Sequence, residues 1–210
     1  MRNNRGFFIT LEGCEGSGKS TQIELIKEYL KKRGVESEFT REPGGTPISE
    51  KIREVILDGS NTAMTDEAEA LLYAASRIQH VKEKILPSVA EGKVVVCDRY
   101  IDSSFAYQAY ARGLGYEYVE KINCEALRLC TPDMTIFFDI SPDEAFSRKG
   151  GADKGDRLEE SGIDFHRAVY SGYKELAKRF PKRIVVIDAR RGKEEIFCEV
   201  KKSIDSLLGL

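Results

Sequence analysis

The most constraining feature of this chain is a phosphate-binding loop sequence, GCEGSGKS at residues 13–20. It follows the apolar run at residues 7–11, and it precedes a segment with apolar residues at 23, 25, 26, 29 and 30, which is the stripe of an amphipathic helix. A strand, a glycine-rich turn and a helix in this order aim backbone N–H groups and the positive end of the helix dipole at one point. The sequence therefore predicts a nucleoside triphosphate site at the end of a buried strand.

The residue types within the loop predict separate tasks. Glycines allow the backbone angles and the close approach, Lys19 can reach the β- and γ-phosphates, and Ser20 can bind Mg²⁺. We expect contacts to the triphosphate from Gly13, Cys14, Glu15, Gly16, Ser17, Gly18, Lys19, Ser20 and Thr21.

Strand and helix patterns alternate along the chain. Strand candidates are residues 7–11, 35–40, 93–97, 134–140 and 183–187, and helical patterns cover 47–57, 65–91, 102–111, 116–130, 142–148, 162–180 and 193–208. The runs 94–96 and 184–187 are continuous and β-branched, as expected of strands covered on both faces. Alternation implies parallel pairing through crossovers. We predict an α/β, three-layer P-loop NTPase fold with a five-stranded parallel sheet flanked by helices.

Composition limits the possible classes. Residues 1–210 fit one domain, and 41% hydrophobic residues can build its core. The 33 basic and 35 acidic residues nearly cancel, so we expect no nucleic-acid partner. The five cysteines form no C-x-x-C pair, and no apolar stretch approaches the length of a membrane span. We therefore expect a cytoplasmic protein without a membrane partner.

A phosphate-binding loop does not by itself separate kinases, GTPases and motor ATPases. The guanine-reading N-K-x-D segment of a GTPase is absent, and no chain is left over for the partner domain of a large ATPase. Arginines instead follow predicted strands directly, as in REPGGTP at 41–47 and DRY at 98–100. Open α/β sheets bind ligands at these strand ends, so the sequence favours a second anion site there.

These segments carry a specific resemblance. REPGGTP, CDRYIDSSFAYQ at 97–108 and DRLE at 156–159 stand in the order of the thymidylate kinase family, and the similarity runs from residue 7 to about residue 189. The resemblance implies ATP-dependent phosphorylation of dTMP to dTDP, with Mg²⁺ as cofactor and ATP and dTMP as substrates. It also implies a homodimer, although the sequence alone does not show the oligomeric state.

The resemblance implies roles for residues around the transferred phosphoryl group. Arg99 corresponds to an arginine beside the acceptor phosphate, and Arg53 to one that clamps it; a guanidinium suits this because it is permanently charged and bidentate. Asp98 would hold a metal-bound water. Glu15 matches an acidic residue that binds the sugar 3′-hydroxyl, the alternative being a helix-capping role. Glu42 resembles a second carboxylate near the sugar or metal.

The thymine-reading residues implied by the resemblance lie on two helical segments. Tyr73 and Arg77 are four residues apart and share a helix face, so a stacking ring and a donor to O4 could act together. Ser104 and Gln108, also four apart, match positions at the pyrimidine edge. Tyr107 matches an aromatic residue that crowds the ribose 2′ carbon, although taken alone it would be read as an ordinary core or rim residue.

Residues 148–157 are rich in glycine and charge, and they predict a lid. Because the loop at 13–20 has no arginine, the resemblance implies the bacterial arrangement with a catalytic arginine in the lid. Arg148 and Arg157 are the candidates, together with lid lysines, and the sequence leaves open which cation is critical. Closure would bring positive charge over the donor phosphates and exclude water. The adenine is expected near the turn at 188–191.

Two other hypotheses remain at this stage. One is a kinase with a broader nucleotide range, which the combination of Tyr107, Arg77 and Gln108 disfavours. The other is a nucleotide-sensing protein that binds ATP without turnover. Lys19, Arg99 and a basic lid speak against it, because binding alone needs no second anion site. The catalytic residues that we predict are Lys19, Arg99, Arg148, Arg157 and Glu15.

Overall fold

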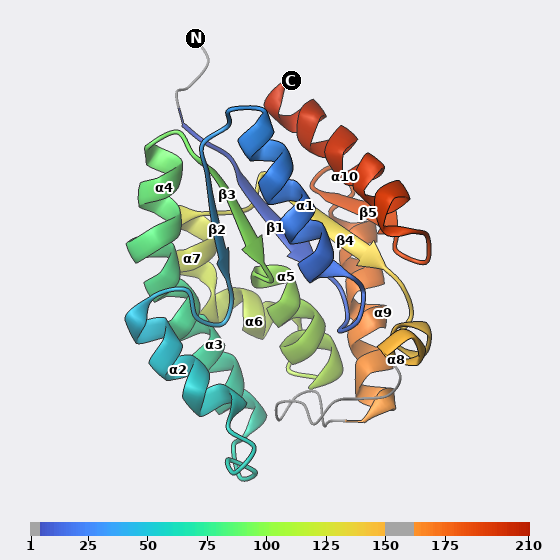
Figure 1. Ribbon diagram of the computed structural model, residues 1–210. Coiled ribbons are helices and arrows are strands. Elements are labelled where there is room, and N and C mark those ends of the chain that lie inside the picture. Colours follow the sequence, from blue (N-terminus) through green and yellow to red (C-terminus); the bar gives the residue numbers. More distant parts are fainter. Residues whose placement is uncertain (1–4, 150–161) are drawn as a thin grey trace.

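The apolar run that precedes the phosphate-binding loop forms the central strand of a parallel sheet (Figure 1). The computed structural model of the chain describes residues 5–149 and 162–210. In this part the sheet has five strands in the order β2-β3-β1-β4-β5, and every neighbouring pair is parallel. The bounds, each within two residues of those predicted, are β1 (Phe8–Glu12), β2 (Ser37–Arg41), β3 (Val94–Asp98), β4 (Met134–Asp139) and β5 (Ile184–Asp188).

Helical segments fill the connections between strands, and one more helix follows the last strand. They are α1 (Lys19–Lys32), α2 (Pro47–Leu57), α3 (Asp66–His80), η1 (Val81–Ile85), α4 (Leu86–Ala90), α5 (Ile101–Ser104), η2 (Phe105–Ala111), α6 (Tyr116–Ile122), α7 (Cys124–Leu129), α8 (Pro142–Lys149), α9 (Ile163–Arg179) and α10 (Lys193–Leu208). The segments η1 and η2 are π-helical.

Three helices that the sequence predicted as continuous change or break along their length. The one expected over 102–111 changes from α5 to the π-helical η2 at Phe105. The helix expected over 65–91 widens into the π-helical turn η1. Pro87 follows it, and a proline has no N–H to donate while its ring would crowd the carbonyl one turn earlier. The helix expected over 116–130 is divided at Asn123, whose side chain donates to the carbonyl of Val119 at 2.8 Å and competes with the backbone pattern.

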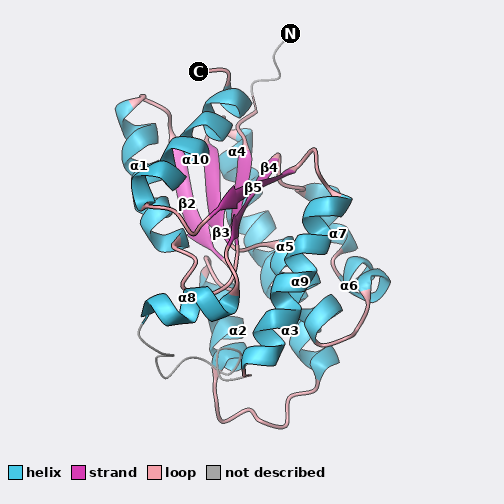
Figure 2. Ribbon diagram, turned by 90° about the vertical axis from the view of Figure 1, so that its right-hand side faces the viewer, coloured by secondary structure: helices cyan, strands magenta, loops and turns pink. Residues whose placement is uncertain are grey.

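Alternate residues of each strand supply two separate cores, because successive side chains on a strand point to opposite faces. On β1, Ile9 and Leu11 pack with α1 and α10, whereas Phe8 packs with residues of α4, α5 and α9. Figure 2 shows α1 and α10 on one side of the sheet and α4, α5 and α9 on the other. The predicted layered α/β class is therefore confirmed.

The β-branched run of β5 corrects one expectation. Val94, Val95 and Val96 are buried as predicted for a strand covered on both faces, but Val186 is 45% exposed. The reason is position, since β3 lies inside the sheet and β5 is its edge. Composition alone therefore did not distinguish an inner strand from an edge strand.

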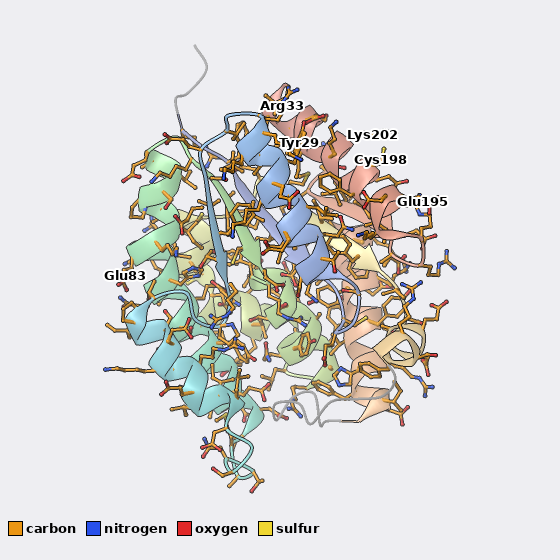
Figure 3. All side chains as sticks on the ribbon, viewed as in Figure 1. Tyr29, Arg33, Glu83, Glu195, Cys198 and Lys202 are labelled. Carbon is orange, nitrogen blue, oxygen red and sulfur yellow. The ribbon has the colours of Figure 1, made fainter. Side chains whose placement is uncertain are left out.

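The first and last helices pack against each other on one face. The ring of Tyr29 meets that of Phe197 edge-on with centroids 6.2 Å apart, and its hydroxyl donates to Asp205. Figure 3 shows Tyr29 on α1 facing the helix that carries Cys198 and Lys202. Among the described residues, no helix combines the length and the apolar character needed to cross a membrane.

The strand order brings three chain segments together. Because β3 pairs with β1 on one side and with β2 on the other, the segments that follow β1, β3 and β2 leave the same edge of the sheet in adjacent positions. These segments are the phosphate-binding loop, DRY and REPGGTP. Parallel sheets bind ligands at this edge.

Candidate active site

The phosphate-binding loop has the backbone that its glycines predicted. Gly13 has a φ of 146° and Gly18, the N-cap of α1, a φ of 89°, both in the region that side chains disfavour. Lys19 Nζ donates to the carbonyl oxygens of Gly13 and Cys14, each at 3.0 Å. Burial, and secondarily the charge of Arg99, lowers the pKa of Lys19 to about 8. The loop thus holds one ammonium group at its mouth.

Two unusual loop residues have different surroundings. The thiol of Cys14 is buried and donates to the carbonyl of Ile140 at 3.3 Å, and burial raises its pKa. Glu15 lies at the edge of the pocket beside the loop. Gly18 is the N-cap of α1 and makes no side-chain cap bond of its own, so both roles of Glu15, at the sugar 3′-hydroxyl and at the helix start, stay predictions.

One pocket beside the loop gathers the residues that the sequence assigned to the acceptor. It is lined by Glu42, Arg53, Tyr73, Arg77, Arg99, Ser104, Tyr107 and Gln108, together with Glu15, Arg41 and Asp98. These residues come from segments spread over more than 90 positions, and their convergence is a result of the fold. What they bind remains a prediction.

Arg77 is the structural centre of this pocket and is 1% exposed. It donates to Glu42 Oε2 at 2.8 Å, to Asn123 Oδ1 at 2.6 Å and to the carbonyl of Tyr100 at 3.1 Å. Counting the described residues, these contacts use three of the five guanidinium N–H groups. Arg77 can therefore brace the pocket and still present donors to it.

The carboxylate of Glu42 is held by protein groups on both oxygens. Oε2 accepts from Arg77, and Oε1 lies 3.1 Å from Nδ1 of His80, whose Nε2 is 2.8 Å from the hydroxyl of Thr40. Glu42 lines the pocket and braces Arg77, and its role at the sugar or the metal, which the resemblance implied, stays a prediction.

Arginines of the REPGGTP segment and of the helix after it differ in exposure. Arg53 Nη1 donates to the carbonyl of Pro43 at 2.8 Å, which ties α2 to the loop while the side chain lines the pocket. Arg41 forms a two-bonded pair with Glu50, at 2.7 and 3.1 Å, at an exposed position. The bond from Arg41, together with one from the Gly45 amide, lowers the pKa of Glu50 to about 2. Arg41 therefore braces the loop.

The DRY segment combines an unusual backbone with unpartnered acceptors. Arg99 has a φ of 66°, a left-handed conformation that costs a non-glycine residue roughly 1–2 kcal/mol. Its guanidinium carbon lies 5.3 Å from the ring centroid of Tyr107. Among the described residues, buried Asp98 Oδ1 and Ser104 Oγ have no hydrogen-bond partner. Both are free to meet a ligand.

The amide of Gln108 is oriented by a residue that the sequence did not single out. Gln108 Nε2 donates to Glu69 Oε1 at 2.9 Å, and Glu69 is buried and also paired with Arg112. Because a carboxylate only accepts, it fixes the NH₂ group toward itself and leaves Oε1 as an acceptor for the pocket.

The lid candidates are only partly described. Arg148 lies in the last turn of α8 and donates to the carbonyl oxygens of Ala189 and Arg190, in the turn where the resemblance places adenine. It does not line the acceptor pocket among the residues described there. Arg157 lies outside the described residues. The choice between lid cations stays open.

Sequence reasoning missed several residues that support the site. They are the buried Glu12, Glu69, Asn123 and Tyr173, which hold residues that line the pocket, and the half-buried Ser103, which lines it. Only Glu12 gave a usable signal, since a carboxylate at the end of an apolar strand must find partners when it is buried.

A phosphate-binding loop beside a second, arginine-lined pocket at one sheet edge is an arrangement suited to phosphoryl transfer between nucleotides, so fold and site are those of a P-loop nucleotide kinase. A family model described as thymidylate kinase matches residues 11–200. The chain belongs to the thymidylate kinase family, and it is therefore a kinase.

Individual relatives agree along nearly the whole chain. It is 48% identical to a thymidylate kinase of Clostridium novyi over 94% of this chain and 98% of that protein. It is 49% identical to one of a Thermoanaerobacter species over 96% and 97%. A crystal structure of thymidylate kinase from Ehrlichia chaffeensis superposes with a TM-score of 0.78 at 31% identity, covering 95% of this chain and 99% of that one.

Proposed function

We propose that this chain transfers the γ-phosphoryl group of ATP to the phosphate of dTMP, giving ADP and dTDP. The observation that carries the proposal is the pocket beside the phosphate-binding loop, where the residues predicted for the acceptor converge. Acceptor and donor phosphates would meet between Lys19 on one side and Arg99 and Arg53 on the other. An oxygen of the dTMP phosphate attacks the γ-phosphorus, and the bond to the β-phosphate oxygen breaks.

The chemistry demands charge neutralisation and alignment more than covalent help. Lys19 and the loop amides would hold the donor phosphates. The guanidinium groups of Arg53 and Arg99 would hold the acceptor phosphate, and Glu15 the sugar 3′-hydroxyl. A lid cation, Arg148 or Arg157, would approach the transferred group on closure.

The residues present fit a magnesium ion. Buried Asp98 Oδ1 has no partner among the described residues, and Ser20 is exposed in the first turn of α1 beside the loop. We propose that Ser20 binds the ion directly and that Asp98 holds a water bound to it. The ion would supply charge stabilisation to the triphosphate.

The hydrogen-bonding groups of the pocket complement those of thymine. Arg77 offers donors to O4, and Gln108, turned by Glu69, offers an acceptor to the N3–H group. Tyr73 would stack on the base, and Tyr107 would crowd a ribose 2′-hydroxyl. Cytosine presents the opposite pattern at both positions, an acceptor at N3 and an amino group at C4. A site built for one pattern leaves buried groups unpaired with the other.

A panel of monophosphates tests the proposal. Coupled assays with Mg-ATP and dTMP, dUMP, dCMP or dGMP should give the highest kcat/KM for dTMP, with dCMP lower by at least about 10². Similar values for all four would favour a kinase of broad range. Absence of turnover with any of them would favour a protein that only binds ATP.

We also propose that the chain acts as a cytoplasmic homodimer. Three large apolar side chains of α2 and α3 are about half exposed, namely Ile48, Val55 and Leu71. Their placement on two helices that pack together supports a shared interface. Light scattering should give twice the mass of the chain.

A further inference from the structure

The carboxylate of Glu12, at the end of β1, sits behind the acceptor pocket and is fully buried. Oε1 accepts from the amides of Tyr100, at 2.8 Å, and Ser103, at 3.3 Å. Oε2 accepts from the hydroxyls of Ser103, at 2.6 Å, and Tyr173, at 2.8 Å. The side chain of Glu12 thus links β1 to α5 and α9 close to Arg99.

The same two hydroxyls reach Arg99. Nη1 of Arg99 lies 3.4 Å from both Ser103 Oγ and Tyr173 OH, and those two oxygens are 2.9 Å apart. Each hydroxyl has one proton to donate. When both protons point to Glu12, both oxygens turn lone pairs toward the guanidinium.

We infer that Glu12 is a positioning residue for Arg99: by accepting the protons of Ser103 and Tyr173 it makes both hydroxyls acceptors and so aims the guanidinium at the acceptor phosphate. The inference rests on the proposed function, because it takes dTMP as the acceptor. It adds to that function a relay from a buried carboxylate, through two hydroxyls, to the cation that grips the substrate.

The charge balance agrees with this arrangement. Burial, and then the nearby Asp102, raises the pKa of Glu12 to about 7, while Ser103, Arg99 and Tyr173 oppose the rise. A buried carboxylate loses its hydration, so it stays ionised only if the groups around it stabilise the charge. Ser103, Arg99 and Tyr173 are the groups that compensate it, which ties its charge to the position of Arg99.

A purely structural role is the rival interpretation, since Glu12 also links three elements. The substitution Glu12→Gln separates the two. The amide keeps an acceptor for the backbone N–H groups, but its NH₂ end donates to the hydroxyls and turns their protons away from their present direction. Backbone links survive, and the acceptor environment of Arg99 is lost.

The test compares dTMP and ATP in Glu12→Gln and in the wild type, by calorimetry for dTMP and by steady-state kinetics for both substrates. We expect the Kd and KM for dTMP to rise about tenfold, the loss of one charge-assisted contact, with the KM for ATP unchanged. Tyr29→Phe is the control, because it removes a hydroxyl bonded to Asp205 where α1 packs on α10, outside the pocket. It should lower Tm without changing dTMP affinity.

A double-mutant cycle sharpens the result. Tyr173→Phe should weaken dTMP binding in the wild type and have a smaller effect in Glu12→Gln, because the relay is already broken there. Equal effects in both backgrounds, or a Glu12→Gln protein that binds dTMP as well as the wild type, would overturn the inference. If Glu12→Gln does not fold, Ser103→Ala and Tyr173→Phe test the inference instead. Folded variants that bind dTMP with wild-type affinity would contradict it.

The outcome is distinct from that of the proposed function. Wild-type protein that does not phosphorylate dTMP refutes the function. Wild-type protein that does, combined with an unaffected Glu12→Gln, refutes only the relay.

Discussion

The donor and acceptor sides of this site are built in different ways. The donor side is one continuous loop in which backbone carbonyls hold Lys19 and glycine angles set the shape. The acceptor side has no continuous segment. Its cations are held by buried side chains from distant elements, such as Glu42 and Asn123 around Arg77.

Because of this difference, substitutions on the donor side should affect mainly catalysis, and substitutions on the acceptor side should also affect the stability of the fold. A donor-side side chain can be removed with little effect on the fold, because the backbone still forms the loop. An acceptor-side side chain is often also part of the core, so its removal leaves a buried charge without a partner. Substitutions on the two sides should therefore fail in distinguishable ways.

The largest effect is expected from Arg77→Ala on the acceptor side. It leaves Glu42 buried beside His80 without its guanidinium partner, which typically costs 3–5 kcal/mol, about half of a domain's stability. Urea unfolding should show the loss, and dTMP binding should fail as well. A variant of unchanged stability would contradict the view that the acceptor side is part of the core.

On the donor side, Lys19→Ala should lower kcat by about 10²–10³ because it removes a preorganised cation from the transferred phosphoryl group. Tm and dTMP affinity should stay near wild-type values. Lys27→Ala, exposed on the same helix, is the matched control. A large loss of stability in Lys19→Ala would contradict the proposed difference between the donor and acceptor sides.

Arg53→Ala tests an acceptor cation that is not in the core. We expect the KM for dTMP to rise about 10- to 100-fold, corresponding to one charged hydrogen bond of about 1.5–3 kcal/mol. Lys51→Ala, exposed on α2, should leave kinetics unchanged. Equal KM values in wild type and Arg53→Ala would remove this residue from the phosphate site.

Because of Glu12, the free energy of unfolding should depend on pH. Its folded pKa of about 7 lies above the ordinary 4.5, because burial and Asp102 outweigh Arg99, Ser103 and Tyr173. The folded chain thus binds the proton more tightly, and stability contributed by Glu12 declines as pH rises from about 4.5 to 7. The unfolding free energy of wild type minus Glu12→Gln should fall by about 2–3 kcal/mol between pH 5 and 8. A difference that rises with pH would refute this assignment.

The smallest effect should follow from Arg41→Gln. Its pair with Glu50 is exposed on both members, at 47% and 38%, and such pairs contribute about 1 kcal/mol or less. Thermal unfolding at low and high salt measures it. A loss comparable with that of Arg77→Ala would show that exposure does not separate the two arginines.

Prediction from the sequence succeeded where the signal is local. The loop at 13–20 is contiguous, and Tyr73 and Arg77 could be paired because four positions place them on one helix face. The strands were found because continuous apolar runs are distinctive, but the exposure of Val186 depends on which neighbour β5 lacks, and that is a property of the sheet.

Prediction failed where partners are distant along the chain. Glu12 meets Ser103 and Tyr173 across 91 and 161 positions, and Arg77 meets Asn123 across 46. These side chains carry ordinary polar chemistry that any surface could hold. Only the packing of the folded chain shows that they are buried together. The residues that support the acceptor pocket could therefore be identified only from the structure.

The left-handed backbone of Arg99 carries strain at a single torsion angle. Glycine is the residue that this angle prefers, yet Arg99→Gly would also leave the buried Glu12 without a cation that compensates its charge. An engineer who screens variants for heat resistance alone should therefore not recover Arg99→Gly among the improved ones. The strain is retained because the same side chain also serves the core.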